Sequence, residues 1–111
     1  MFDAPRPLPL IDEATRLRDA DARVGTTLRD KWHLDSLIAV GGMGAVYEAT
    51  HRNGMRGALK ILEPHLGQVP ACRERFLREG KLANRVQHVG AVRVLDDDVA
   101  EDGSAFLVME L

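Results

Sequence analysis

The stretch Ile38-Ala39-Val40-Gly41-Gly42-Met43-Gly44-Ala45-Val46-Tyr47 decides the fold of this chain. It places three glycines within four residues, between two apolar segments that are prone to form strands. Glycine clusters of this kind occur where the backbone adopts a positive φ or approaches another group closely. The pattern predicts a hairpin with strands over residues 32–39 and 45–51. Its N–H groups are suited to hold phosphate oxygens, and a tight turn without any ligand fits these residues equally well.

A third strand is predicted over residues 57–62, after a turn at Arg52-Asn53-Gly54. This strand is apolar apart from Lys60. A lone lysine in such a run usually faces solvent from an edge strand. The alternative is a buried lysine, which needs a partner for its charge.

A helix is predicted over residues 70–87, with Pro70 in its first turn. At about 100° per residue, Glu79 falls on the apolar stripe of this helix. The stripe consists of Cys72, Phe76, Leu82, Ala83 and Val86. A carboxylate that faces a core needs a cation or hydrogen-bond donors. Glu79 therefore either lies at the rim of the stripe and reaches solvent, or is the partner of Lys60.

Two more strands are predicted over residues 91–96 and 105–111. Between them lie the acidic residues Asp96-Asp97-Asp98 and then Glu101-Asp102-Gly103. This run indicates a solvated loop, with a divalent-cation site as the less favoured alternative. The last strand runs to Leu111 without a polar cap, so we expect the domain to continue beyond it.

The composition narrows the classes of partner. The 111 residues carry 15 Lys and Arg against 17 Asp and Glu, a formal charge of −2. This balance gives no reason to expect nucleic acid as a partner, and no apolar run is long enough for a membrane segment. The single cysteine, Cys72, excludes a disulfide framework and is consistent with a cytoplasmic location. Residues 1–30, with three prolines near the start, are predicted to be a flexible leader that contains a possible short helix.

Taken in order, these elements resemble the N-terminal lobe of a bacterial serine/threonine protein kinase of the eukaryotic type. Four segments within residues 31–111 carry the resemblance. They are residues 40–47, which are similar to the glycine-rich loop, 57–60 (V-A-I-K strand), 75–79 (R-F-x-R-E helix segment) and 106–110 (strand before the hinge). The resemblance implies an α+β fold, with a five-stranded antiparallel sheet and one main helix. It also implies that the lobe is truncated at the hinge and that the C-lobe is absent.

The resemblance further implies an ATP site. Lys60 would hold the α- and β-phosphates, and Glu79 would position it through an ion pair. Met109 would be the gatekeeper beside the adenine, and the carbonyl of Glu110 would accept a hydrogen bond from the adenine amine. The cofactor-binding residues implied are Ile38, Ala39, Val40, Gly41, Gly42, Met43, Gly44, Val46, Ala58, Lys60, Met109 and Glu110.

The resemblance also restricts the second hairpin, because Val46 and Ala58 must cover the same face of the adenine. A two-residue turn at Asn53-Gly54 would put them on opposite faces. A three-residue turn with His51 opposite Met55 puts them on the same face. We therefore predict a type I turn followed by Gly54 in the left-handed conformation.

Three positions depart from the family pattern. Ala39 stands where the family has its first glycine, Gly57 where it has valine, and His88-Val89-Gly90 where it has His-Pro. Alanine at the first position is expected to stiffen the loop or to weaken nucleotide binding. Glycine at position 57 is expected to weaken its strand locally.

The sequence contains no H-R-D or D-F-G segment. It therefore offers no base for the substrate hydroxyl and no ligand for the Mg²⁺ that the complete family domain uses. We expect an ATP-binding lobe, inactive by itself, whose family activity is transfer of the ATP γ-phosphate to protein Ser or Thr. Its expected partners are ATP, a kinase C-lobe and, in a complete kinase, a protein substrate. A non-catalytic interaction module and a non-functional truncated gene product are the alternatives.

Overall fold

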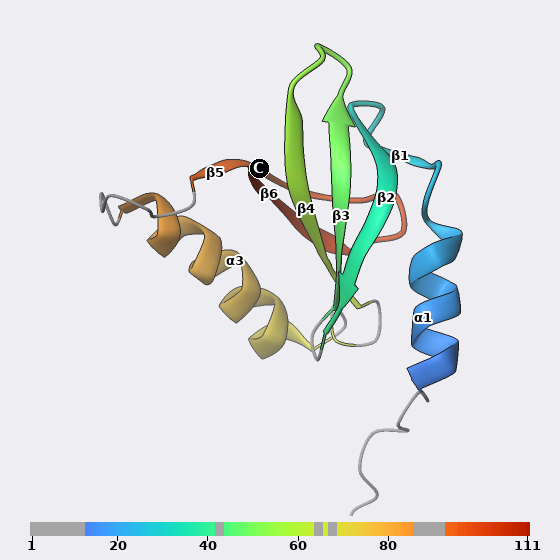
Figure 1. Ribbon diagram of the computed structural model, residues 1–111. Helices are drawn as coiled ribbons and strands as arrows, with labels where there is room; N and C mark the ends of the chain where they lie inside the picture. The colour runs from blue at the N-terminus through green and yellow to red at the C-terminus, as the bar shows by residue number, and fades with distance from the viewer. Residues whose placement is uncertain (1–12, 42–43, 64–65, 67–68, 86–92) are drawn as a thin grey trace, which may run out of the picture.

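The computed structural model describes residues 13–41, 44–63, 66, 69–85 and 93–111, and within the last helix it describes no side chain from residue 79 onward. Figure 1 shows one curled antiparallel sheet with a helix at either side. The elements are α1 (Glu13–Ala22), β1 (Thr27–Leu28), β2 (Trp32–Val40), β3 (Gly44–His51), β4 (Arg56–Leu62), α3 (Pro70–Arg85), β5 (Val94–Val99) and β6 (Ala105–Glu110).

The sheet has six strands in the order β1-β2-β3-β4-β6-β5, so the prediction of five strands is wrong by one. The additional strand is β1, which pairs with the start of β2 through Leu28 and Trp32. Two residues are too short for any periodic pattern, and only the pairing with β2 makes them a strand. Residues 13–30, expected to be a leader, thus contain both a helix and a strand of the sheet.

The β3–β4 hairpin has the predicted three-residue turn. The N–H of His51 donates to the carbonyl of Met55 at 2.7 Å, the N–H of Gly54 donates to the carbonyl of His51 at 2.8 Å, and Gly54 has φ +92°. Val46 lies directly opposite Lys60 in the resulting register. Because Lys60 and Ala58 are two residues apart on one strand, Val46 and Ala58 share a face, as predicted.

The β5–β6 hairpin uses the same device at Glu101-Asp102-Gly103. The N–H of Ala100 donates to the carbonyl of Ser104 at 2.8 Å, and Gly103 has φ +89°. In both turns the residue before the glycine accepts a hydrogen bond from a backbone N–H two positions on, Asn53 from Met55 at 2.9 Å and Asp102 from Ser104 at 3.0 Å. An Asx residue followed by glycine therefore sets both turns.

The acidic run is part of a strand, so the prediction of a solvated loop for Asp96 and Asp98 is wrong, and the strand predicted to end at residue 96 extends to Val99. Lys31 Nζ lies 2.9 Å from a carboxylate oxygen of each aspartate. The indole Nε1 of Trp32 donates to Asp96 at 2.9 Å. Since β1 and β5 are the two ends of the sheet, these contacts draw its opposite edges together. We refer to Lys31, Trp32, Asp96 and Asp98 as the closing cluster.

The sheet has two distinct faces. The outer face carries Tyr47, Leu59 and Val108, which lie side by side on β3, β4 and β6 and are fully buried. The inner face carries Val46, Lys60 and Leu107 in the neighbouring row. A second buried cluster on the inner side joins the sheet to α3 through Leu62, Phe76, Ala105 and Leu107.

Gly57 does not simply weaken its strand, because neighbouring side chains occupy the space of its missing side chain. A Cβ at this position would lie 2.6 Å from Val108 Cγ1 and 3.6 Å from the Trp32 ring. Trp32 is 2% exposed and also packs edge-on against His51 with ring centroids 4.8 Å apart. The Val108 methyl and the Met109 carbonyl, which a Cβ would meet at 3.0 Å, thus make glycine the residue that fits at position 57, and the Trp32 ring lies at ordinary contact distance.

Helix α1 is fastened to the outer face. The buried hydroxyl of Tyr47 donates to the carbonyl of Ala20 at 2.6 Å, near the end of the helix. At the same end, Arg23 pairs with Asp102 in the β5–β6 turn at 2.6 Å. Figure 1 shows α1 beside β2, along the part of that strand that β1 does not cover. The helix therefore shields an edge that would otherwise be open to pairing.

Gly44 should tolerate no side chain, whereas Gly41 should accept one. A Cβ at Gly44 would lie 1.8 Å from the Ile61 carbonyl oxygen, but a Cβ at Gly41 meets nothing closer than 3.9 Å. We expect Gly44→Ala to lower the free energy of unfolding by about 1–3 kcal/mol or more, and Gly41→Ala to leave it nearly unchanged. Urea unfolding followed by the fluorescence of Trp32, the single tryptophan, measures both. Equal stability of the two variants would contradict this account of Gly44.

The closing cluster should make stability depend on pH. The Lys31 ammonium and the N–H of Val99 hold the pKa of Asp98 below its ordinary value of 3.8. The pKa of Lys31 is raised by hydrogen bonds to Asp96 and Asp98. Stabilisation from Asp98 is therefore present above pH 3.8 and lost as the pH falls through the folded pKa. Stabilisation from Lys31 is present below pH 10.5 and lost as the pH rises through its folded pKa.

Asp98→Asn should weaken the dependence of the free energy of unfolding on pH in the acid range. We expect the variant to be less stable than the parent at pH 7, and to lose less additional stability between pH 5 and pH 2. Asp97→Asn is the matched control, because Asp97 is exposed and alternates with Asp98 along β5. Urea midpoints across this range measure the effect, and parallel profiles for the two variants would refute it.

Tyr47 should ionise only at very alkaline pH. Burial raises the pKa of its hydroxyl to about 12, because the phenolate would lose its hydration. It is the single tyrosine of the chain, so the ultraviolet absorbance of tyrosinate reports this one side chain. We expect no tyrosinate signal below pH 11 in the folded protein and a midpoint near 10 in urea. A native midpoint near 10 would show that the hydroxyl is not held against Ala20.

Candidate nucleotide site

The inner face brings together four of the twelve residues that the family resemblance assigned to the nucleotide. Val46 lies opposite Lys60, and Ala58 lies opposite Met109. All four side chains are half-buried, so the face is apolar and accessible at once. A flat aromatic ring can lie against small side chains such as Val46 and Ala58 without displacing them.

Lys60 does not lie on an edge strand, so the predicted edge-strand position of this lysine is wrong, and its side chain is half-buried. β4 has β3 on one side and β6 on the other. The ammonium lies 5.9 Å from the centroid of the Phe76 ring, which α3 buries against the inner side of the sheet. This cation–π contact accommodates part of the charge of a half-buried lysine.

Glu79 follows Phe76 by three residues in α3, so it lies on the same side of the helix. Its side chain is outside the described residues. The ion pair with Lys60 therefore remains a prediction.

The glycine-rich turn closes the first hairpin, as predicted. Val40 lies opposite Ala45, and the N–H of Gly41 donates to the carbonyl of Gly44 at 2.7 Å. The tip residues, Gly42 and Met43, are outside the described residues. Gly44 fits against the Ile61 carbonyl, so this glycine is needed for close approach of β3 to β4.

The remaining predicted positions lie at the ends of two strands. Ile38 and Ala39 are exposed beside an irregularity in β2 that shifts its register with β3. Ile38 is 54% exposed, which leaves an apolar side chain available at the margin of the inner face. Glu110 is exposed at the end of β6, where its N–H donates to the carbonyl of Arg93 at 2.9 Å. This hydrogen bond uses the N–H of Glu110 and not its carbonyl. The predicted role of the carbonyl therefore stays a prediction.

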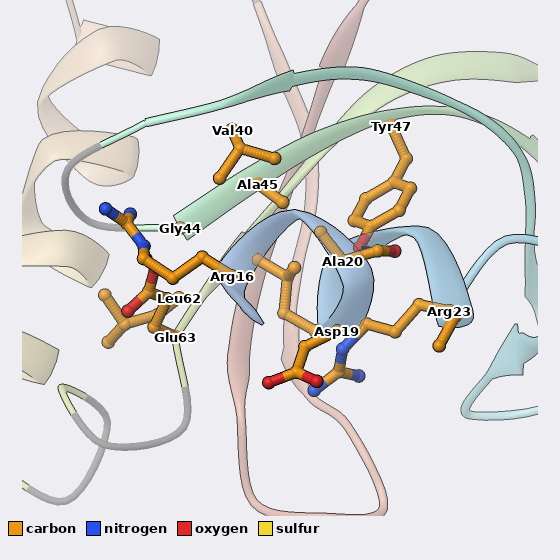
Figure 2. A pocket seen from close by; sticks show the side chains of 12 residues that line it. Arg16, Asp19, Ala20, Arg23, Val40, Gly44, Ala45, Tyr47, Leu62 and Glu63 are labelled. Atoms are coloured by element: carbon orange, nitrogen blue, oxygen red, sulfur yellow. Dashed lines mark hydrogen bonds and ion pairs between the residues drawn. The ribbon is translucent and has the colours of Figure 1, made fainter. Parts of the chain in front are cut away.

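The structure adds a pocket that sequence reasoning missed. It has a volume of about 280 Å³ and lies between α1 and the outer face (Figure 2). Val46 and Lys60 alternate with Tyr47 and Leu59 and therefore face the other side of the sheet. Its walls include Ala45, Tyr47 and Ile61, and Arg16 lies at its margin beside Glu63. α1 has a weakly amphipathic, polar sequence, so no pattern in the sequence pointed to this contact.

Within the described ranges, no three His, Cys, Asp or Glu residues are grouped closely enough to hold a metal ion. Asp96 and Asp98, considered above for a cation, are engaged by Lys31. In the same part of the chain, no helix is long and apolar enough to cross a membrane.

Comparison with known proteins adds relatives that match most of the chain, although no family model matches it. It is 38% identical over 96 residues to the serine/threonine-protein kinase pkn3 of Myxococcus xanthus, which covers 86% of this chain. It is 40% identical over 94 residues to the serine/threonine-protein kinase PknA of Mycobacterium tuberculosis, which covers 80% of this chain. A solved double mutant of the PknI kinase domain of Mycobacterium tuberculosis superposes with a TM-score of 0.65 at 27% identity over 79% of this chain.

The matches cover only part of each relative. The chain spans 18% of pkn3, 22% of PknA and 34% of the solved PknI chain. The curled antiparallel sheet with α3 against it corresponds to the N-lobe of those kinase domains. The chain is therefore a homologue of the bacterial serine/threonine-protein kinases, and the part that it shares with them is the N-lobe of the kinase fold.

Proposed function

We propose that this lobe binds ATP on the inner face of its sheet. The observation that carries the proposal is the register of β3, β4 and β6, which puts Val46, Ala58, Lys60 and Met109 on one accessible face. Homology to serine/threonine kinases over 80% of the chain supports the same assignment.

Each residue has a role that follows from its position and chemistry. Val46 and Ala58 offer a smooth apolar surface for the adenine, and Met109 lies beside Ala58 at its inner margin. Lys60 lies two residues beyond Ala58 on β4 and is the next residue of that strand on the same face. Its ammonium is proposed to hold the α- and β-phosphates. The glycine-rich turn joins β2 to β3, and the family resemblance assigns the N–H groups of this turn to those phosphates.

Phosphoryl transfer is proposed only for a protein in which this lobe acts together with a catalytic loop and a metal-binding aspartate. Mg²⁺ would then neutralise charge on the ATP phosphates, and the reaction would move the γ-phosphate to a Ser or Thr hydroxyl of a protein. The contribution of this lobe is to bind and orient the nucleotide. For the 111 residues alone we expect a dissociation constant for ATP no tighter than about 1 mM, because half of the family's binding surface is absent.

Replacing Lys60 should remove nucleotide binding. We expect Lys60→Met to weaken ATP binding at least about tenfold, because a charge-assisted contact to phosphate contributes about 1.4 kcal/mol or more. Phosphorus NMR of ATP titrated with the protein measures millimolar affinity directly. In a complete kinase that contains this lobe, the same change should abolish phosphorylation.

Arg52→Met is the matched control for this experiment. It removes one positive charge from the exposed turn at the far end of the same hairpin and leaves the inner face intact. We expect ATP affinity within twofold of the parent. If both variants bind ATP as the parent does, Lys60 has no role in phosphate binding and the proposed site is rejected.

A further inference from the structure

Arg16 of α1 joins the start of the glycine-rich turn to the residue that follows β4. Its guanidinium donates through Nη2 to the carbonyl of Gly41, and through Nε to the carboxylate of Glu63. Gly41 begins the turn, and Glu63 directly follows β4, the strand that carries Lys60. Figure 2 shows the Arg16 side chain extended from α1 toward Glu63 and the start of β3 at Gly44.

The ion pair of Arg16 with Glu63 is partly buried, whereas the contact of Arg16 with the Gly41 carbonyl is exposed. The side chains of Arg16 and Glu63 are only 23% and 15% exposed. Two contacts near the other end of α1 hold the helix in place, Tyr47 to the Ala20 carbonyl and Arg23 to Asp102. A guanidinium fork on an anchored helix can engage both acceptors at once with little further loss of conformational entropy.

We propose that Arg16 is a positioning residue for the glycine-rich turn, and that α1 thereby helps to position the segment proposed to bind the phosphates. By holding the Gly41 carbonyl and Glu63 together, Arg16 keeps the turn at a set distance from the end of β4. Its consequence for nucleotide binding rests on the function proposed above. Its effect on the turn does not, because the contact exists without any ligand.

Gly41 connects α1, which lies on the outer face, to the candidate nucleotide site on the inner face. The Gly41 carbonyl belongs to the last described residue before the tip, and the N–H of the same residue closes the turn onto Gly44. Both polar groups of Gly41 are therefore used, one within the turn and one toward α1. Among the described residues, loss of the Arg16 contact leaves Gly41 held by its hydrogen bond to Gly44 within the hairpin.

Amide hydrogen exchange measured residue by residue tests the proposal without nucleotide. In Arg16→Ala we expect exchange at Gly41 and Ala45 to rise about tenfold, the factor that corresponds to about 1.4 kcal/mol. Exchange at Leu107 and Val108 in β6 should stay within twofold. Arg18→Ala is the matched control, because Arg18 lies on the same helix and, within the described part of the chain, its side chain donates to the nearby Thr15 at 3.5 Å.

A second variant separates the two acceptors. Glu63→Gln removes the carboxylate charge and leaves Arg16 free to hold Gly41, so we expect a smaller rise at Gly41, about twofold to threefold, than in Arg16→Ala. An Arg16→Ala variant with exchange at Gly41 equal to that of Arg18→Ala would overturn the proposal. An equal rise at Gly41 and in β6 would overturn it too, because Arg16 would then stabilise the whole lobe and not the turn.

The outcome is distinguishable from a failure of the proposed function. Faster exchange at Gly41 in Arg16→Ala, together with unchanged ATP affinity in Lys60→Met, would retain the positioning role and reject the nucleotide site. The reverse pair of results would reject the positioning role and retain the site. If both hold, Arg16→Ala should also weaken ATP binding, whereas Arg18→Ala should not.

Discussion

The contact of Lys31 and Trp32 with Asp96 and Asp98 is the constraint on which the rest of the structure depends. It joins residues at the two ends of a six-stranded sheet, so it curls the sheet and encloses the outer core. A buried indole donor and an ammonium satisfy carboxylates that would otherwise be costly to bury in a strand. The same indole lies within van der Waals distance of the position that a Cβ at Gly57 would take, so closure packs the Trp32 ring against β4.

Enclosing the outer face leaves the inner face available for chemistry. The outer core needs large apolar residues such as Tyr47 and Leu59, whereas the inner row alternates with them and carries Val46 and Lys60. Because side chains alternate along each strand, the residues that form the core and those proposed to bind the nucleotide lie on opposite faces of the same sheet. α1 then adds a second link, since Tyr47 and Arg16 connect the helix to the outer core and to the glycine-rich turn respectively.

Several features could be predicted from the sequence because their signals are local. The two glycine-containing turns follow from Asn53-Gly54 and Asp102-Gly103, where an Asx side chain and a left-handed glycine act within three residues. The requirement that Val46 and Ala58 share a face selected the correct turn length. The helix of residues 70–85 and the strand that carries Lys60 followed from periodicity and from the family resemblance. The Lys60–Glu79 ion pair stays a prediction.

Other features were decided only by tertiary structure. β1 is a strand solely because β2 accepts it. β5 extends beyond residue 96 through its pairing with β6, and Lys31 and Trp32, more than sixty positions earlier, reach the carboxylates of Asp96 and Asp98. The contact of Arg16 with Gly41 could not be predicted either, since the sequence of α1 is polar and only weakly amphipathic. By itself the sequence determined the hairpins, because backbone geometry acts over a few neighbours, and the family resemblance supplied the parity of the second hairpin and the residues expected on the inner face. Burial and pairing of charge act between distant segments, and only the folded chain decides those partners.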